Sequence, residues 1–308
     1  MLQAESTSRD MQLSTSFDNE VIGIKFTGEN RQKVNLLLRN KPELVEIAKL
    51  LYANNKEKAY GFLEELGKIN PNNENSEKTR MLMEILGEYS EHSVIHSKWI
   101  KEIIESLDGL QQAQGSEIFH NVNLKELAEA IERHDIGKLV MPDSILDKHG
   151  MYTEGDTRVK ETHPVTGHLI LRALNFDDKS VRLALTHHLK YKTLPDGKVV
   201  ISGYPVEDFL KYCQETHQKP ELNEEDQIAA FADVFSALID IHRPTDVFGT
   251  HGSGISDSER YAKAFEVMDT KIFNDKYYQE GDGVPIYSSF KNAIMETLEK
   301  AKGISQAV

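Results

Sequence analysis

The chain has 308 residues, of which 39% are hydrophobic, and its formal net charge is −14 at pH 7. This acidic balance argues against binding of a nucleic-acid polymer, which needs concentrated Lys and Arg to displace counterions. The single cysteine, Cys213, excludes a disulfide framework and a thiolate zinc cluster. The sequence lacks the apolar core of a signal peptide and an apolar run of about 20 residues, so we expect a cytoplasmic protein with no membrane span.

The first part of the chain predicts a tail followed by a small domain. Residues 1–18 are polar and rich in Ser and Thr, which is typical of a flexible tail. The segment VIGIKF at 21–26 predicts a short strand, and apolar segments that follow it predict helices. The polar cluster NPNNENSE at 70–77 is the best candidate boundary. Residues 19–77 are therefore expected to form a small N-terminal domain, helical or α+β, for which we consider a regulatory role.

Residues 78–308 show helical periodicity without a series of strands, so a mainly all-α bundle is predicted. The expected helices cover 79–107 with a break near 89–90, then 123–138, 163–174, 180–191, 223–242, 256–268 and 288–301. The helix at 223–242 stops before Arg243-Pro244 because the residue before a proline disfavours helical backbone.

Several of these helices end an apolar face in histidine or aspartate. The stripe Leu127, Ala128 and Ile131, for example, leads to His134 and Asp135. A lone buried histidine is usually just hydrogen-bonded, but an ionised carboxylate buried without a partner is costly. The same pattern recurs at His92, His96, His163, His187, His188 and Asp233. Metal sites in helical bundles are commonly built from side chains on facing helices, so we predict a shared metal centre.

The motifs around these residues resemble those of the HD-GYP subfamily of HD-domain metal-dependent phosphohydrolases. The resemblance covers about residues 85–300. It rests on HDIGK at 134–138, MPDSILDK at 141–148, ETHPVTGHLIL, the pair His187-His188, Gly203-Tyr204-Pro205 and ADVFSAL. It implies an all-helical domain with a bi- or trinuclear metal centre that hydrolyses the bacterial messenger cyclic di-GMP.

Position by position, the resemblance implies a set of site residues. The implied metal ligands are His92, His134, Asp135, His163, His187, His188 and Asp233, with Glu88 as a carboxylate for a third ion. Asp135 would bridge two ions, Lys138 would contact the scissile phosphate, and Arg243 and Tyr204 would contact the substrate. His96 is expected to support the site from the core rather than to bind metal. A simpler interpretation of Lys138 and of Arg243 is that each is a solvated cation near a helix end.

The chain departs from the family pattern on the substrate side. Leu189 replaces a Glu, the segment KVVIS precedes Gly203, and Ser236 stands where the family commonly has Asp. An insert at 206–226 is expected either to cover the site as a lid or to decorate the surface. A domain that binds a cyclic dinucleotide, or a partner such as a diguanylate cyclase, without turnover is therefore one alternative, and another nucleotide phosphohydrolase is a second.

The implied ligands are imidazoles and carboxylates, which suit iron and, next, manganese. We expect two divalent ions and leave a third ion and a homodimer open. A carboxylate-bridged ion pair about 3.5–4 Å apart activates a shared water, so that a bridging hydroxide can attack phosphorus. Lys138 and the metals would offset the charge on the phosphoryl oxygens. The predicted function is a metal-dependent cyclic di-GMP phosphodiesterase.

Overall fold

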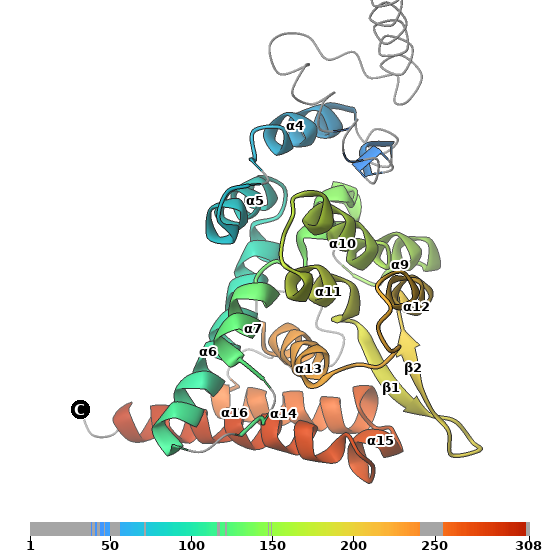
Figure 1. The fold of residues 1–308 in the computed structure, drawn as a ribbon. Helices are drawn as coiled ribbons and strands as arrows, with labels where there is room; N and C mark the ends of the chain where they lie inside the picture. Colours follow the sequence, from blue (N-terminus) through green and yellow to red (C-terminus); the bar gives the residue numbers. More distant parts are fainter. Residues whose placement is uncertain are drawn as a thin grey trace, which may run out of the picture.

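The computed structural model describes residues 38, 41, 44–45, 47–49, 56–70, 72–115, 118–120, 122–146, 148, 150–240 and 255–305. This part of the chain is helical apart from one two-stranded sheet, so the mainly all-α prediction is confirmed (Figure 1). Its elements in chain order are α4 (Lys56–Leu66), α5 (Asn75–Tyr89), α6 (Glu91–Gln114), α7 (Leu124–Ile131), the 3-10 helix η1 (Ile136–Val140), α8 (Asp143–Leu146), α9 (Glu154–Lys160), α10 (His163–Ala173), α11 (Asp178–Thr186), β1 (Leu189–Thr193), β2 (Val199–Gly203), α12 (Val206–Glu215), α13 (Glu224–Ile239), α14 (Asp257–Val267), the π-helical turn η2 (Met268–Ile272), α15 (Lys276–Gln279) and α16 (Val284–Ser305). None of the described helices is long and apolar enough to cross a membrane.

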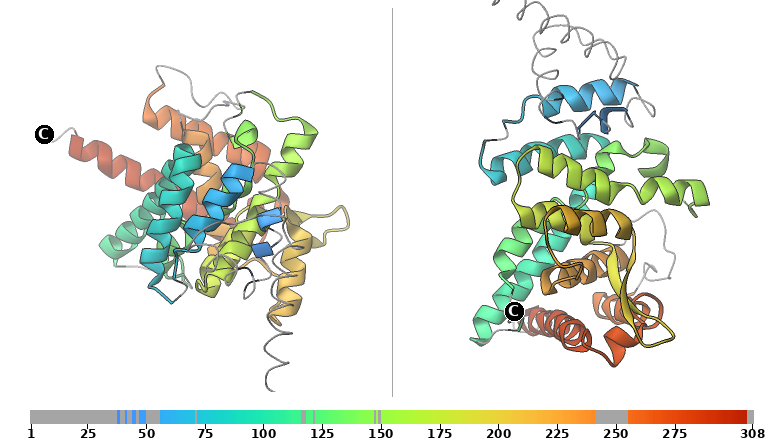
Figure 2. Two further views of the ribbon diagram at one scale, coloured as in Figure 1. Left: turned by 90° about the horizontal axis from the view of Figure 1, so that it is seen from above. Right: turned by 45° about the vertical axis from the view of Figure 1, so that its right-hand side comes forward.

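Two large apolar clusters form the core, one toward each end of the long helix α6 (Figures 1 and 2). The first cluster joins α4 and α5 to η1, α10 and part of α11. The second joins α6, α7 and α13 to α14 and α16. Ile131, at the end of α7, belongs to the second cluster, and Ile136, at the start of η1, belongs to the first. The turn between them, which carries His134 and Asp135, therefore lies at the seam between the two clusters.

The expected helix at 123–138 ends at Ile131, which corrects the prediction. The chain turns through residues 132–135 and continues as η1. Tertiary packing explains the break, because η1 lies so close to α10 that a Cβ on Gly137 would stand 1.9 Å from the carbonyl oxygen of His163. The break expected near 89–90 is confirmed, since Ser90 caps α6 by accepting a hydrogen bond from the amide of Ser93.

The expected helix at 180–191 also ends early, at Thr186, and β1 begins at Leu189. β1 pairs antiparallel with β2 in a register that places Leu189 opposite Gly203, so the KVVIS segment is largely a strand. The connection contains Pro195, Asp196 and Gly197, residues that favour a turn, and Gly197 has a positive φ of 84°. The sequence interpretation had included no strand in this region.

The insert at 206–226 contains α12 and is packed rather than extended. Phe209, Tyr212 and Cys213 of α12 are buried in a third apolar cluster with Leu185 and Leu189. Arg182 of α11 donates hydrogen bonds to the carboxylate of Asp226 and to the carbonyl oxygen of Glu221. The insert therefore forms a fixed layer beside α11 and β1.

Three predictions lie outside the described residues, namely the tail at 1–18, the strand at 21–26 and the position of Arg243. The boundary at 70–77 stays a prediction. Phe62, Leu63 and Leu66 of α4 share the first apolar cluster with Leu82 of α5 and Ile170 of α10, so the described part of α4 packs on the bundle.

Candidate metal centre

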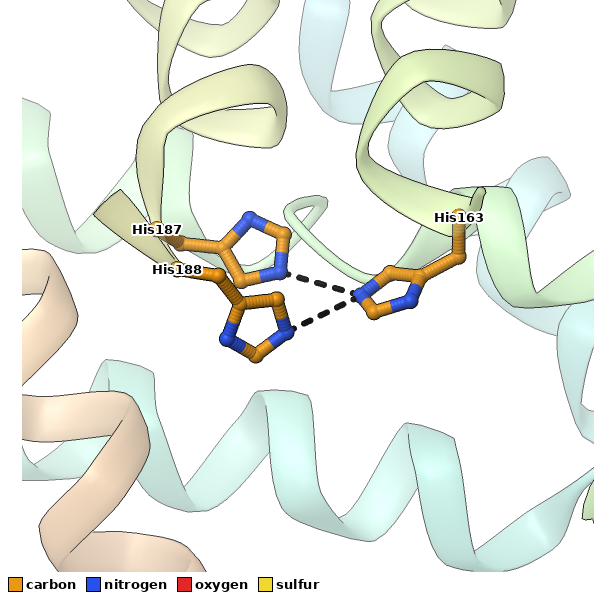
Figure 3. Close-up of side chains that lie close together, drawn as sticks. All are labelled: His163, His187 and His188. Atoms are coloured by element: carbon orange, nitrogen blue, oxygen red, sulfur yellow. Dashed lines mark hydrogen bonds between the residues drawn. The ribbon is translucent and has the colours of Figure 1, made fainter. Parts of the chain in front are cut away.

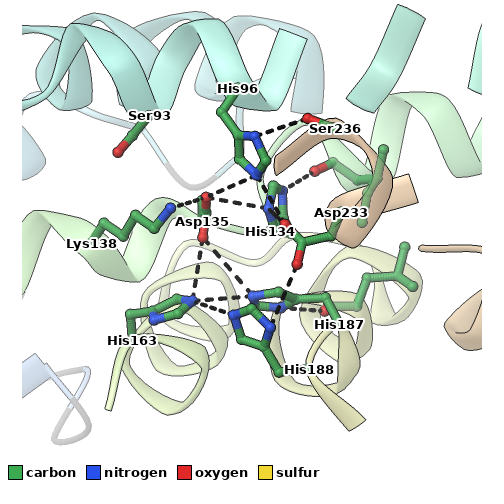
Figure 4. A network of polar contacts seen from close by, with 12 residues as sticks. Ser93, His96, His134, Asp135, Lys138, His163, His187, His188, Asp233 and Ser236 are labelled. Carbon is green, nitrogen blue, oxygen red and sulfur yellow. Dashed lines mark hydrogen bonds and ion pairs between the residues drawn. The ribbon is translucent and has the colours of Figure 1, made fainter. Parts of the chain in front are cut away.

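Histidine and aspartate side chains converge on one buried region from five separate segments (Figure 4). They are His96 of α6, His134 and Asp135 of the turn before η1, His163 at the start of α10, His187 and His188 directly after α11, and Asp233 of α13. We call these seven residues the ligand cluster. All are buried except His188, whose side chain is 19% exposed.

Three of the histidines meet ring nitrogen to ring nitrogen (Figure 3). Nε2 of His163 lies 3.1 Å from Nε2 of His187 and 3.2 Å from Nε2 of His188. His187 and His188 follow α11 directly, and His163 opens α10, so the contact between α10 and α11 fixes the group.

Backbone carbonyls hold the opposite nitrogen of three rings in the ligand cluster. The Nδ1 atoms lie 2.8 Å from the oxygen of Ile131 for His134, 2.6 Å from that of Lys160 for His163, and 3.2 Å from that of Leu183 for His187. A carbonyl oxygen only accepts, so each of these Nδ1 atoms carries a proton and donates it. In the neutral rings Nε2 is then an inward-facing lone pair, which is the arrangement that metal-ligating histidines adopt.

The two carboxylates lie between the rings. Oδ1 of Asp135 is 3.3 Å from Nε2 of His163, and its Oδ2 is 3.3 Å from Nε2 of His134. Oδ1 of Asp233 is 2.9 Å from Nε2 of His96, and its Oδ2 is 3.5 Å from Nδ1 of His188. Asp135 therefore presents one oxygen to each side of the ligand cluster.

The electrostatics keep the carboxylates ionised and most of the rings neutral. Burial opposes ionisation of Asp135, but His134 and Lys138 outweigh it and hold its pKa well below the usual value. Burial and the neighbouring His134 lower the pKa of His187 to about 3. Burial also lowers the pKa of His163. Lone pairs and negative oxygens are therefore available together at neutral pH.

His134 behaves differently. Burial works to lower its pKa, but Asp135 and Asp233 raise it to about 9. Its Nε2 atom is fully buried and lies 3.3 Å from Oδ2 of Asp135, without the geometry of a hydrogen bond. A cation in the ligand cluster would replace that proton and bind this nitrogen directly.

The residues present fit a metal centre. The lone pairs of His163 and His187 face each other at 3.1 Å with no proton between them once both Nδ1 atoms donate, and a cation between them removes that repulsion. Three groups can each offer three ligand atoms within 4.8 Å of one another: His163 with His187 and His188, His96 with His134 and Asp233, and His134 with Asp135 and His187. Imidazole and carboxylate donors suit iron or manganese, and they are less characteristic of zinc or cobalt sites.

Lys138 and Tyr204 border the ligand cluster. Lys138 forms an ion pair with Oδ2 of Asp135, three residues earlier, and its side chain is 18% exposed. The ring of Tyr204 lies 4.6 Å from the ring of His188 and 6.5 Å from that of His163, between centroids. Both residues are placed to meet a ligand that reaches the ligand cluster, although their assignment to substrate stays a prediction.

The structure places His96, and not His92, in the ligand cluster. Both lie on the apolar stripe of α6, but α6 begins at Glu91, so His92 sits in its first turn with a side chain 37% exposed. Nε2 of His92 lies 3.4 Å from Oδ2 of Asp240, and Glu88 is exposed. The apolar periodicity identified the face of α6 on which both histidines lie. It could not show that His92, in the first turn, is partly exposed while His96, one turn later, is buried.

Comparison with known proteins agrees with this geometry. Residues 89–238 match the family described as HD domain. Over 120 residues the chain is 36% identical to the cyclic di-GMP phosphodiesterase response regulator RpfG of Xanthomonas campestris pv. campestris, covering 38% of this chain and 27% of that protein. It is 33% identical over 128 residues to a cyclic di-GMP phosphodiesterase of Thermotoga maritima, covering 40% and 32% of the two chains. A cyclic di-GMP phosphodiesterase of Vibrio cholerae is 27% identical over 196 residues, covering 59% and 36%. The chain thus spans about a third of the length of these curated relatives.

Among solved structures, the chain is similar to the HD domain of the phosphodiesterase PgpH of L. monocytogenes, with a TM-score of 0.46 and 16% identity over 72% of this chain and 98% of that chain. The same domain in complex with cyclic-di-AMP gives a TM-score of 0.45 and 15% identity, over 71% and 97% of the two chains. The family match and the curated relatives confirm the resemblance expected from the motifs, and residues 89–238 are the part of this chain that matches the HD domain.

Proposed function

We propose that this chain is a metal-dependent phosphodiesterase that hydrolyses cyclic di-GMP. The observation that carries the proposal is the ligand cluster, in which buried carboxylates and lone-pair nitrogens from distant segments face one another. The relatives matched over the HD region are named cyclic di-GMP phosphodiesterases, which supports this substrate. Cleavage of this messenger would take place in the cytoplasm.

We propose that the ligand cluster holds two divalent ions, with iron our first choice and manganese the second. His163, His187 and His188 would hold one ion, and His96, His134 and Asp233 the other. Asp135 would bridge them, because its Oδ1 faces His163 and its Oδ2 faces His134. Bound divalent ions supply an activated water and offset charge on the phosphoryl oxygens.

Lys138 would bind the substrate phosphate. In the described structure it is paired with Asp135, and it is half-buried at the edge of the ligand cluster. With the charge of Asp135 shared by bound cations, the ammonium group of Lys138 would be available to contact a phosphoryl oxygen. Tyr204, beside His188, would contact the nucleotide, and so would Arg243, which lies outside the described residues.

A turnover assay tests the proposal. Protein purified without oxygen and loaded with Fe²⁺ or Mn²⁺ is incubated with cyclic di-GMP, and products are separated by chromatography. We expect a linear dinucleotide or GMP, and no product after chelation. Asp135→Ala is expected to lose both metal and turnover, whereas Lys138→Ala is expected to keep its metal and lose turnover. His120→Ala, at an exposed position, serves as the control.

Metal content separates the ligand assignments. His96→Ala is expected to bind about one ion fewer per chain than wild type, measured by mass spectrometry of the loaded protein. His92→Ala is expected to keep the wild-type content with two ions, because its ring lies outside the ligand cluster. Loss of metal from His92→Ala alone would contradict this assignment and favour a ligand set that includes His92.

One observation keeps a second function in view. Leu189 stands where the family pattern places Glu, and it is buried at the start of β1 rather than facing the ligand cluster. A loaded protein that binds cyclic di-GMP in calorimetry without cleaving it would favour a domain that senses the dinucleotide or engages a diguanylate cyclase. Cleavage of another nucleotide phosphoester alone would favour a different phosphohydrolase.

A further inference from the structure

Asp226 is a buried carboxylate that joins the start of α13 to the end of α11. In the first turn of α13 it accepts a hydrogen bond from the amide of Asn223 at 2.9 Å, which closes the N-terminal cap of that helix. Its Oδ1 atom also accepts a hydrogen bond from the hydroxyl of Thr186, at 2.7 Å. Thr186 is fully buried at the last position of α11, so it directly precedes His187 and His188 of the ligand cluster.

Arg182, one turn before Thr186 on α11, completes this connection. Its Nε atom lies 3.1 Å from Oδ1 and 3.0 Å from Oδ2 of Asp226, and its Nη2 atom lies 2.6 Å from Oδ2. A guanidinium that meets a carboxylate through two nitrogen atoms makes a geometrically specific contact. Arg182 also donates to the side chain of Gln218 and to the carbonyl oxygen of Glu221, both in the insert at 206–226. The same arginine therefore fixes Asp226 and the insert against α11.

The polar connection matters because the apolar contact between α11 and α13 is small. Among the residues of α11, all of which the structure describes, only Leu183 belongs to the second apolar cluster, which contains the buried face of α13. Val181 and Ala184 belong to the first cluster, and Leu185 belongs to the third. Apolar burial is non-directional, so one side chain does not fix the position of α11 along α13. The hydrogen bonds of Asp226 are directional and can fix it.

The position of Asp226 on α13 relates this connection to the ligand cluster. Asp233 follows it by seven residues, about two helical turns, so both carboxylates lie on one face of the helix. Oδ2 of Asp233 lies 3.5 Å from Nδ1 of His188, which follows α11 (Figure 4). The amide of His187 donates to the carbonyl oxygen of Leu183 at 3.1 Å, so His187 moves with α11. A shift of α11 relative to Asp226 would therefore change the spacing of these side chains.

We propose that Asp226 is a positioning residue, which sets the distance between the ligands that follow α11 and the ligand on α13. The inference rests on the proposed metal centre, in which His187 and His188 hold one ion and Asp233 holds the other. Asp226 thus acts on the spacing of the two ions without contacting either. The insert supports the metal centre from outside, because Arg182 anchors it beside the same carboxylate.

Two variants break the connection at different points. Asp226→Asn keeps the size of the side chain but loses the charge and one accepting oxygen that hold Arg182. Thr186→Val removes only the hydroxyl bond, so the ion pair with Arg182 and the cap of α13 stay intact. The matched control is Asp275→Asn, because Asp275 also accepts from a threonine hydroxyl and a backbone amide but joins β1 to α15.

Metal affinity is the first readout. Metal-free protein is titrated with Mn²⁺ in a calorimeter, and thermal unfolding of each metal-free variant is recorded in parallel. Asp226→Asn and Thr186→Val are expected to bind Mn²⁺ about 10-fold more weakly than wild type, the lower end of the effect of groups that orient metal ligands. Thr186→Ser is expected to restore most of the affinity. Asp275→Asn is expected to keep wild-type affinity although its unfolding temperature falls.

Electron paramagnetic resonance reports the spacing itself. Two Mn²⁺ ions about 3.5–4 Å apart on a shared bridging carboxylate are magnetically coupled, and their spectrum differs from that of isolated ions. We expect the coupled spectrum in loaded wild type and in Asp275→Asn. At equal metal occupancy, we expect it to be weakened in Asp226→Asn and in Thr186→Val, because the ligands on α11 and α13 no longer keep their separation.

Equal loss of Mn²⁺ affinity in Asp226→Asn and Asp275→Asn would overturn the proposal. Wild-type affinity together with a wild-type spectrum in Thr186→Val would overturn it as well, and this variant decides the matter if Asp226→Asn does not fold. Absence of cyclic di-GMP turnover in wild type, with the losses of affinity present in both variants, would refute the proposed enzyme and leave the role of Asp226 standing.

Discussion

Gly137 offers the sharpest test of how the ligand cluster is assembled. It lies in η1, two residues after Asp135, where this short helix meets α10. A Cβ added to Gly137 would stand 1.9 Å from the carbonyl oxygen of His163, 2.5 Å from the amide nitrogen of Gly167 and 2.7 Å from Oγ1 of Thr166. Two of these atoms are backbone, so no side-chain rotation can relieve the contact.

The size of the effect follows from these distances. Ordinary van der Waals contact begins at 3.4 Å, so η1 and α10 must separate by about 1.5 Å in Gly137→Ala. Overpacking typically costs about 1–3 kcal/mol. The hydroxyl of Thr166 can donate to the carbonyl oxygen of Thr162 or His163 instead of that of Gly137, so loss of this contact adds little. We expect a loss of about 1–3 kcal/mol and a fall in Tm of roughly 5 °C.

The same displacement should empty the metal centre. Oδ1 of Asp135 and Nε2 of His163, now 3.3 Å apart, would move too far apart to share an ion. Thermal unfolding and metal content of Gly137→Ala are compared with those of Gly109→Ala. Gly109 lies exposed in α6 with nothing within 4 Å of an added Cβ, so its replacement should stabilise by about 0.5–1 kcal/mol. Wild-type Tm and metal content in Gly137→Ala would refute the steric argument.

Two further predictions concern buried cationic and titratable groups. Lys78 is buried and donates hydrogen bonds to the carbonyl oxygens of Leu174 and Asn175 at 3.0 and 2.9 Å, so Lys78→Ala should destabilise by about 3 kcal/mol in chemical denaturation. Burial lowers the pKa of His168, whose Nδ1 donates to the carbonyl oxygen of Val181. Its contribution to stability is therefore complete above its unfolded pKa of about 6.5 and declines as the pH falls below that value, because the unfolded chain takes the proton first. His168→Asn should lose less stability than wild type between pH 7 and pH 5, and an equal loss in both proteins would count against this reading.

The sequence predicted site residues best where a histidine or aspartate lies on the apolar face of a predicted helix. His134, His163, His187 and Asp233 each end or interrupt an apolar face, and the structure brings all four together. The buried bundle was predictable for the same reason, since an apolar stripe every three or four residues needs a partner surface.

The remaining features depend on distances that a one-dimensional pattern does not contain. His92 and His96 share one helix face, and only the start of α6 at Glu91 shows which of them is buried. The early end of α7 follows from the contact between Gly137 and His163, which are 26 positions apart in the chain. The β1–β2 hairpin, by contrast, carried a local signal, because Asp196-Gly197 precedes the β-branched residues Val199, Val200 and Ile201; the prediction of a helix at 180–191 overlooked it.

The position of the ligand cluster at the seam between the two apolar clusters has a mechanical consequence. His134 and Asp135 lie between the two apolar clusters, so ions bound there would cross-link the two halves of the bundle that these clusters form. A small displacement of one half relative to the other would change the distance between the metal ions. Since α4 shares the first apolar cluster with Ile136 of η1, a displacement of α4 would reach the turn that carries Asp135 through packed side chains.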